Sequence, residues 1–420
     1  MLRAGFVGIA VTLVALVRPA PGVRGQRASR AAGRGLVRLC TELGATFIKV
    51  GQGASTRADL LPPGLVAELT TLQDRVPPFP FPEVRRCIEE ELGEPLDTIY
   101  DDFDPVPVAA ASVAQVHRAT LRANGADVAV KVRRPDITEK VQLDRSILLF
   151  IARAFERLVP TLRLVALESA IRTFCDAVED QIDFEKELAN NLRFTREFAT
   201  DPDIEFPGVF PEACSAGVLT MDFIEGIPEA ELEAHDIDVE RIVRCGLRGV
   251  CRMIFQHGFV HADIHPGNLR FLAPGRIIAL DLGLVGEIDD HDRLATARLL
   301  FALSTGDGPT VAKTFYDESP NPQTRDYPQY EREMSAFVES VRVKGLAHLQ
   351  VSAEIGRIFD ILRRHRVQAR AHMTLVNLAI MTAEGLSRRL APEVVLGEEI
   401  IPYLAEALGV PVPELSPTSH

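Results

Sequence analysis

The chain has 420 residues, of which 46% are apolar, so it is long enough to bury more than one sizeable core and is globular rather than disordered. Its formal net charge of −13 argues against a general nucleic-acid binder that works by neutralising phosphates. The six cysteines form no C-x-x-C pair, a pattern typical of free thiols in a reducing compartment rather than of a disulfide or zinc framework.

Residues 1–40 form a segment of their own character. The stretch AGFVGIAVTLVALV (residues 4–17) is apolar but too short for an ordinary membrane span, and no clean cleavage site for export follows it. Arginines follow without a single acidic residue before Glu42. An apolar segment next to a basic one would suit contact with an anionic membrane surface, whereas a frayed leader or a misassigned start is the alternative. We expect a cytoplasmic protein that is peripheral at the cytoplasmic membrane.

Residues 41–100 are predicted to be a helical extension. Apolar and polar positions alternate at helical spacing, interrupted by FIKVGQGASTRADLLPPG (residues 47–64). Prolines break the chain after residue 76, and Pro82 with Glu83 are predicted to start a further helix.

Residues 101–226 begin with a β pattern. The stretches VPVAAAS, VAQVHRATL and DVAVKV predict three strands, with a small-residue turn after the first and a hairpin at residues 124–127. A long helical stretch to about residue 198 and a strand in GVLTMDFIEG follow. Residues 227–390 form the next segment, in which residues 236–390 read mostly as amphipathic helices around two short strands, and residues 391–420 read as a tail.

The segments FVHADIHPGNLRF (residues 259–271) and IIALDLGLVGE (residues 277–287) carry the strongest chemical signal. An Asp with an Asn five residues later, followed by a second Asp in a strand-turn DLG, is the arrangement of a kinase catalytic loop and metal-binding turn. We predict that Asp263 orients or deprotonates the phosphoryl acceptor, and that Asn268 and Asp281 hold Mg²⁺.

A zinc site is the alternative for the same loop, because His261, Asp263 and His265 are possible ligands. Pro266 and Gly267 break the helix that such a cluster would prefer, and no nearby Cys or Glu completes a tetrahedral set. We therefore favour the kinase interpretation and expect His261 to support the loop structurally.

Lys131 stands between valines on a predicted central strand, where an ammonium group requires a counter-charge. A kinase-like lobe uses such a lysine to hold the α and β phosphates and a helix carboxylate to orient it. Glu187, in QIDFEKELANNLRF, is the predicted partner, although most acidic residues around it also fit a solvated helix face. Lys131 and Glu187 join Asp263 in the predicted catalytic set.

The stretch AAAS ahead of Lys131 occupies the place of a glycine-rich phosphate loop. Alanine methyl groups restrict φ, so this loop is expected to be stiffer than a glycine loop and to alter nucleotide preference. Ala110, Ala111 and Ser112 are the predicted nucleotide-binding residues, with Ser112 able to hydrogen-bond a phosphate.

Together these motifs resemble the UbiB/ADCK family of atypical, protein-kinase-like proteins, which support isoprenoid quinone biosynthesis. The resemblance covers roughly residues 40–290. It rests on FIKVGQGASTRADLLP, LQDRVPP, AAASVAQVH, VAVKVRRP, QIDFEKELANNLRF, HADIHPGN and LDLG. It implies an α+β, bilobal protein-kinase-like fold with a small β-rich N-lobe, a mostly helical C-lobe and an N-terminal helical extension.

The resemblance also implies roles for further residues. Lys49 and Gln52 of the K-x-G-Q element should restrict the site against peptides, and Asp183 matches the aspartate of the family's E-x-D element. Gln181 stands where the first acid of that element would be, so the contact between the two elements departs from the family pattern. The adenine hinge would be MDFIEG, with backbone groups of Asp222 and Ile224.

The interpretation is a Mg²⁺-dependent, ATP- or ADP-binding atypical kinase or ATPase that supports membrane-linked ubiquinone or menaquinone biosynthesis. Its expected partners are the nucleotide, an anionic membrane surface or isoprenoid lipid, and quinone-biosynthesis enzymes, but no nucleic acid. Two alternatives stay open: a pseudokinase scaffold that binds nucleotide without turnover, and a small-molecule kinase of the aminoglycoside or choline type. The second leaves the K-x-G-Q helix unexplained.

Overall fold

The structure is a computed structural model that divides the chain into two compact units. It describes residues 23–43, 47–48, 63–69, 71, 77–158, 167–320, 322–344, 351–394 and 396–411. Unit 1 contains the described residues up to Leu192 together with Gly208–Ile224, and unit 2 contains Arg193–Pro207 and the described residues from Glu225 onward. Residues 193–207, which we assigned to the segment 101–226, therefore lie in unit 2.

Unit 1 is built around an antiparallel five-stranded sheet with the order β1-β3-β4-β6, in which β2 pairs with β3. Its strands are β1 (Tyr100–Asp101), β2 (Ala109–Ala110), β3 (Ala114–Leu121), β4 (Ala126–Arg133) and β6 (Val218–Asp222). β4 pairs with β3 on one side and β6 on the other, and its residues 128–132 are all buried. Side chains at these five positions of the central strand are therefore shielded from water.

Helix α5 (Phe81–Leu92) packs against this sheet. Pro82 lies in its first turn, where a missing N–H costs nothing, and the helix ends at Gly93 in the left-handed conformation with φ 74°. Val84 and Ile88 lie four residues apart on one face and are fully buried. This agrees with the helix start predicted from the sequence.

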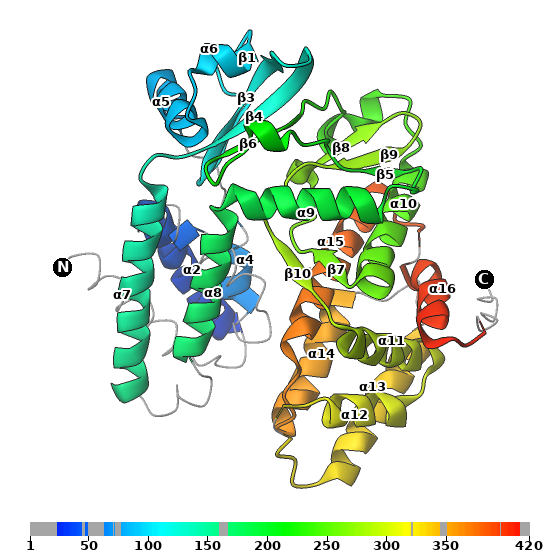
Figure 1. The fold of residues 1–420 in the computed structure, drawn as a ribbon. Coiled ribbons are helices and arrows are strands. Elements are labelled where there is room, and N and C mark those ends of the chain that lie inside the picture. The colour runs from blue at the N-terminus through cyan, green and yellow to red at the C-terminus, as the bar shows by residue number, and fades with distance from the viewer. Residues whose placement is uncertain are drawn as a thin grey trace. The chain divides into compact units, whose positions relative to one another are not determined.

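The other described helices of unit 1 are α2 (Val23–Leu43), α4 (Pro63–Leu69), α6 (Leu96–Ile99), α7 (Ile137–Leu158), α8 (Leu167–Gln181) and the first part of α9 (Phe184–Glu197). The short α6 packs against α5 and β1, whereas α2, α4, α7 and α8 share a core of their own. α7 and α8 lie side by side, as do α2 and α4 (Figure 1). Their shared core contains Cys40, Leu69, Leu148 and Cys175. Burial raises the pKa of the Cys40 and Cys175 thiols to about 11 each, so both are protonated at neutral pH.

Unit 2 contains two small sheets and the helices that follow α9 in the chain. Its strands are β5 (Ile204–Glu205), β7 (Phe259–His261), β8 (Leu269–Leu272), β9 (Arg276–Ala279) and β10 (Val285–Glu287). Its helices are α10 (Val239–Cys251), α11 (Asp290–Thr305), α12 (Gly308–Asp317), α13 (Tyr327–Lys344), α14 (Val351–Arg364), α15 (Ala371–Leu390) and α16 (Leu396–Leu408). β7 pairs with β10, and β9 pairs with β8 and, in parallel, with β5. The expectation of two short strands in residues 236–390 was wrong, because β7, β8, β9 and β10 all lie there.

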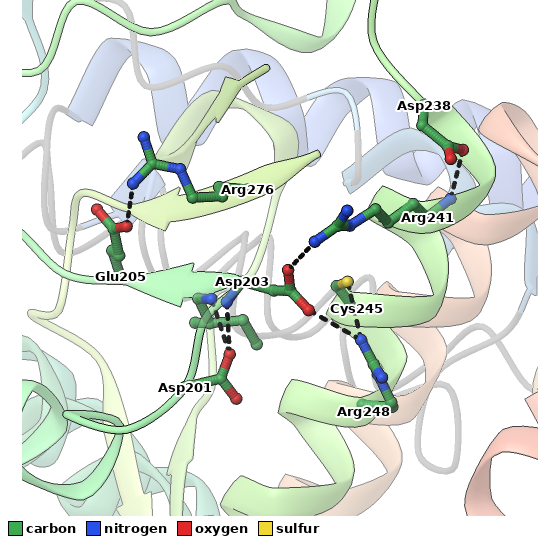
Figure 2. A network of polar contacts seen from close by, with 9 residues as sticks. Asp201, Asp203, Glu205, Asp238, Arg241, Cys245, Arg248 and Arg276 are labelled. Atoms are coloured by element: carbon green, nitrogen blue, oxygen red, sulfur yellow. Dashed lines mark hydrogen bonds and ion pairs between the residues drawn. The ribbon is translucent and has the colours of Figure 1, made fainter. Parts of the chain in front are cut away.

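A polar network explains why residues 193–207 belong to unit 2. Figure 2 shows the Asp203 carboxylate between two arginines of α10, at 2.6 Å from Arg241 Nη2 and 3.1 Å from Arg248 Nη2. Arg241 holds the pKa of the Asp203 carboxyl below its usual range. Asp201 accepts from the Asp203 amide at 2.9 Å and also pairs with Arg252. These bonds and the β5–β9 pairing fasten the segment to α10 and β9.

A second core of unit 2 lies among α11, α12, α13 and α14. Tyr330 and Met334 are fully buried in it, beside Val311 and Val338. The hydroxyl of Tyr330 donates to the Ala312 carbonyl at 3.1 Å, so this buried polar group is satisfied. Across the described part of the chain, no helix is both long enough and apolar enough to cross a membrane.

Candidate functional site

Lys131 and Glu187 form a buried ion pair inside unit 1. Lys131 lies on β4 opposite Val116 of β3 and Leu219 of β6, and its Nζ is 2.8 Å from each carboxylate oxygen of Glu187. The side chains are 11% and 3% exposed. Nζ also lies 5.1 Å from the centre of the Phe184 ring. The structure therefore contains the pair that the sequence predicted.

Asp183 positions Glu187 by starting helix α9. Its Oδ1 accepts from the Glu185 amide at 3.1 Å, and its carbonyl accepts from the Lys186 amide at 3.2 Å. Glu187 follows in the first turn, where the helix dipole favours a carboxylate. The other two residues predicted to be regulatory, Lys49 and Gln52, lie outside the described part of the chain.

The alanine-rich loop joins β2 to β3 and is tied back on itself. The Ala111 amide donates to the Ala114 carbonyl at 2.8 Å, and the Ala111 carbonyl accepts from Arg134 Nε at 2.8 Å. Ala110 pairs with Gln115 across the β2–β3 ladder. The Ser112 side chain is 1% exposed, and its hydroxyl makes no hydrogen bond with any described residue. In this arrangement a phosphate would reach Ser112 only after the loop moved.

The Q-V-H part of the same motif fastens β3 to the segments before α5 and after β1. Gln115 Oε1 accepts from the Phe79 amide at 3.0 Å, and its Nε2 lies 3.0 Å from His117 Nε2. His117 Nδ1 lies 2.8 Å from the Asp104 carbonyl. Since the Gln115 amide nitrogen is a donor, His117 is neutral, with its proton on Nδ1. Gln115 and His117 are therefore structural, a role the sequence analysis did not assign.

We expect unit 1 to lose stability at acidic pH through His117. Burial lowers the pKa of this imidazole in the folded state, so below about pH 6.5, the ordinary value, the unfolded chain binds the proton more readily. The free energy of unfolding should therefore fall as pH drops below that value. In His117→Asn, whose amide can still donate to Asp104, the fall should be shallower. Urea unfolding at pH 7.5 and 5.5 measures the difference, and equal slopes for both proteins would contradict it.

The predicted hinge begins at the end of β6. The Asp222 amide donates to the Gly208 carbonyl at 2.8 Å, and Asp222 Oδ2 accepts from the Gly208 amide at 2.8 Å. A contribution of Asp222 to adenine binding can therefore come only from its carbonyl. Ile224 lies two residues after the end of β6, and its predicted backbone contact with adenine stays a prediction.

The predicted catalytic loop lies in unit 2 between β7 and β8. The Asp263 carbonyl accepts from the His265 amide at 2.8 Å and from Asn268 Nδ2 at 3.1 Å. Because its nitrogen faces Asp263, the Asn268 amide oxygen is left on the other side, as a metal ligand requires. The Asp263 side chain is half exposed.

The DLG turn lies beside this loop. The Leu280 amide donates to the Asn268 carbonyl at 2.8 Å, and the Ala262 amide donates to the Leu284 carbonyl at 3.0 Å. Asp281 Oδ1 accepts from the Gly283 amide at 3.0 Å, which closes the turn. The backbone thus brings Asn268 and Asp281 together within unit 2. Their amide and carboxylate oxygens are the hard donors that Mg²⁺ prefers, so the residues fit this ion.

His261 supports the catalytic loop through a hydrogen bond to its backbone. It is fully buried, and its Nδ1 accepts from the Asp263 amide at 3.2 Å. Burial lowers its pKa, so the ring is neutral. Its ring packs near Phe194, with centroids 6.4 Å apart. A Nδ1 that holds a backbone amide is unavailable to zinc, which favours the structural role predicted for His261.

Near the position where the sequence departs from the E-x-D pattern, an acidic side chain pairs with an arginine of α7. Glu179 lies two residues before Gln181 and could substitute for the missing acid, but its Oε2 is 2.7 Å from Arg145 Nη1 of α7. Gln181 ends α8, and its buried Oε1 has no hydrogen-bond partner among the described residues. Sequence reasoning also missed Arg134, which links Ala111 to the Pro77 carbonyl at 2.9 Å. The signal for Arg134 that the sequence offered was its position directly after the last residue of β4.

Comparison with known proteins places these features in context. Residues 71–315 match the model of the ABC1 atypical kinase-like domain, and residues 334–395 match that of the UbiB helical domain. A Vibrio cholerae protein named probable protein kinase UbiB is 32% identical over 390 residues, which cover 91% of this chain and 72% of that protein. Its namesake from Aeromonas hydrophila is 34% identical over 376 residues, covering 88% and 69%.

A solved structure shares the fold. The Mycobacterium tuberculosis protein Rv3197, solved as an erythromycin complex, matches with a TM-score of 0.58 at 22% identity, covering 88% of this chain and 98% of that one. At this identity the likeness concerns the fold alone. With the domain matches, it confirms the predicted α+β, kinase-like fold.

Proposed function

The chain belongs to the UbiB family of ABC1 atypical kinase-like proteins, and on that premise we propose that it binds ATP or ADP with Mg²⁺ and transfers the terminal phosphoryl group of ATP. The acceptor is water or a small molecule, and the reaction supports isoprenoid quinone biosynthesis at a membrane. The relatives are named probable protein kinases. The link to quinone biosynthesis is what the resemblance of the sequence motifs to the UbiB/ADCK family implies.

The buried Lys131–Glu187 pair is the observation that carries the proposal. Taking two charges out of water is costly, and such a pair on a central strand adds little stability compared with apolar residues of the same size. Its retention at 8% and 3% residue exposure is explained when Lys131 must present an oriented ammonium group to phosphate oxygens. Glu187 then fixes the direction of that group.

The residues of unit 2 supply the remaining roles. Asp263 orients the acceptor and takes its proton, while Asn268 and Asp281 would hold the metal ion. Bound Mg²⁺ supplies positive charge that offsets the charge on the phosphate oxygens. Asp263 needs an exposed carboxylate for its role, and half of its side chain is exposed.

A small acceptor is favoured by the short connection after the DLG turn. β10 begins at Val285, and α11 begins at Asp290, capped by Asp289, whose side chain accepts from the Asp292 amide. In this stretch no room is left for the long activation segment on which protein kinases dock peptides. The restriction of the site that is predicted for Lys49 and Gln52 would likewise exclude peptide substrates.

Membrane contact is favoured by the face of α2. Arg30, Arg34 and Arg38 lie four residues apart and are exposed, whereas Ser29, Gly33 and Cys40 on the other side are buried. Arg34 pairs with Glu68 at 3.3 Å. A row of guanidinium groups of this kind attracts anionic lipid headgroups.

The test is steady-state ATP hydrolysis by the purified chain with Mg²⁺, in the presence of vesicles of phosphatidylglycerol or of phosphatidylcholine. We expect hydrolysis that the anionic vesicles increase. In Asp281→Asn, Mg²⁺-dependent nucleotide binding should weaken at least about tenfold because the variant loses a charged ligand.

The alternatives give different results in the same assay. Nucleotide binding without turnover under all conditions would indicate a scaffold. Hydrolysis that rises with an aminoglycoside or choline and yields a phosphorylated alcohol would indicate a small-molecule kinase of that type. Undiminished binding and turnover in Asp281→Asn would refute the metal assignment.

A further inference from the structure

His265 is held in one orientation next to Asp263 by the backbone of its own loop. Its Nδ1 accepts from the Gly267 amide at 3.0 Å, and its carbonyl accepts from the Asn268 amide at 2.9 Å. Pro266 begins the short 3-10 turn Pro266–Asn268. Since Nδ1 is an acceptor here, the ring proton of neutral His265 is on Nε2.

Nε2 of His265 lies 3.8 Å from Oδ2 of Asp263. Asn268 Nδ2 approaches the same oxygen at 3.5 Å. Asn268 Nδ2 is thus at the limit of hydrogen bonding to Oδ2 and His265 Nε2 lies just beyond that limit, while Oδ1 makes no hydrogen bond to any described residue. The two oxygens of this carboxylate are thus in different surroundings, and Oδ1 is the one left for an acceptor hydroxyl.

Gly267 is the residue that allows the imidazole to lie in this place. A Cβ at position 267 would be 2.7 Å from His265 Cε1 and 2.9 Å from Nδ1, closer than side chains approach one another. The H-P-G-N sequence is therefore one local device, in which the glycine makes room for the ring and its amide holds it. Neither the proposed function nor the zinc alternative explains this arrangement.

We propose that His265 is a positioning residue for the reaction: its Nε2–H, 3.8 Å from Oδ2 of Asp263 here, closes to hydrogen-bond distance when substrate binds, so that Oδ1 faces the phosphoryl acceptor. The inference rests on the proposed function, since it assigns Asp263 a carboxylate that must be oriented. His265 does not touch the transferred group in this role, and it acts through Asp263 alone. Orientation of a reacting group within a fraction of an ångström accounts for large rate effects.

A matched pair of variants separates the two ring nitrogens. His265→Asn keeps an acceptor for the Gly267 amide, as in an Asx turn, but has no donor at the position of Nε2. His265→Gln keeps a donor near that position and loses the acceptor for Gly267. We expect kcat for ATP turnover to fall roughly 10- to 100-fold in the Asn variant, with unchanged affinity for Mg²⁺-ATP, and to fall less in the Gln variant.

The decisive measurement is a double-mutant cycle with Asp263→Asn, read by single-turnover hydrolysis of labelled ATP. If His265 acts through the Asp263 carboxylate, adding His265→Asn to Asp263→Asn changes the rate little. An equal loss in both backgrounds, or a loss of nucleotide affinity in His265→Asn, would overturn the inference and assign His265 to loop structure. A wild-type chain that binds Mg²⁺-ATP without any turnover would overturn the proposed function and, with it, this role.

Discussion

Replacement of Asp263 by Asn is expected to slow ATP turnover by about 10²- to 10⁴-fold, the range that a positioned general base contributes. Asparagine preserves the size of the side chain, so the loop bonds from the Asp263 backbone to His261, His265 and Asn268 should persist. Binding of Mg²⁺-nucleotide should therefore stay close to that of the wild type. Turnover at saturating ATP and the dissociation constant of a fluorescent nucleotide measure the two quantities separately.

A matched control uses an aspartate of the same unit outside the proposed site. Asp290 is 88% exposed and pairs only with Arg293 at the start of α11 among the described residues, so Asp290→Asn should leave turnover unchanged. If Asp263→Asn hydrolysed ATP as fast as the wild type, the assignment of Asp263 as base would be wrong. If Asp263→Asn lost nucleotide binding instead, Asp263 would contribute to binding of the nucleotide rather than to the transfer step.

The parts of the site that could be predicted are those whose chemistry is visible locally. Asp263 and Asn268 lie five residues apart in one loop, so their spacing alone indicates their relation. Lys131 was predictable because an ammonium group among valines requires a partner, and the structure supplies Glu187 at 2.8 Å. In both cases a short stretch carries a constraint that few arrangements satisfy.

The parts that could not be predicted depend on contacts between distant residues. Nothing in the sequence around Asp203 indicates that its carboxylate binds Arg241 and Arg248. The sequence analysis therefore did not predict that residues 193–207 belong to unit 2. Strands of three or four residues such as β7 and β10 are too short to show a period of two. The burial of the Ser112 hydroxyl likewise follows from the fold around it.

His265 is a third case: the sequence identified it as a possible zinc ligand, but it did not indicate the positioning role that we propose. As a histidine near an aspartate it raised the question of zinc, because ligand type alone does not distinguish a metal site from an imidazole that only lies beside a carboxylate. The distinction came from the Gly267 amide at Nδ1, a backbone contact that fixes the tautomer. Sequence shows which groups are present, and only the loop geometry shows which atom of each is in use.

Glu187→Ala is expected to lower the free energy of unfolding of unit 1 by about 3–5 kcal/mol, because it removes from the buried Lys131 ammonium a carboxylate at 2.8 Å. It should also abolish the orientation of Lys131 and weaken nucleotide binding. The chain has no tryptophan, so hydrogen exchange of peptides covering β3 and β4 is the suitable measure of the stability of this unit. Glu185→Ala, on the exposed side of α9, is the matched control and should change neither quantity much.

The double variant Lys131→Met/Glu187→Leu separates stability from function. Removing both charges leaves no buried ion to desolvate, so the stability lost in Glu187→Ala should return wholly or in part. Nucleotide binding should not return, since no ammonium group remains for the phosphates. A double variant that is both stable and competent in binding would show that the pair does not serve the nucleotide. One that stays as unstable as Glu187→Ala would mean that the pair itself holds β4 and α9 together, and its retention would then need no ligand to explain it.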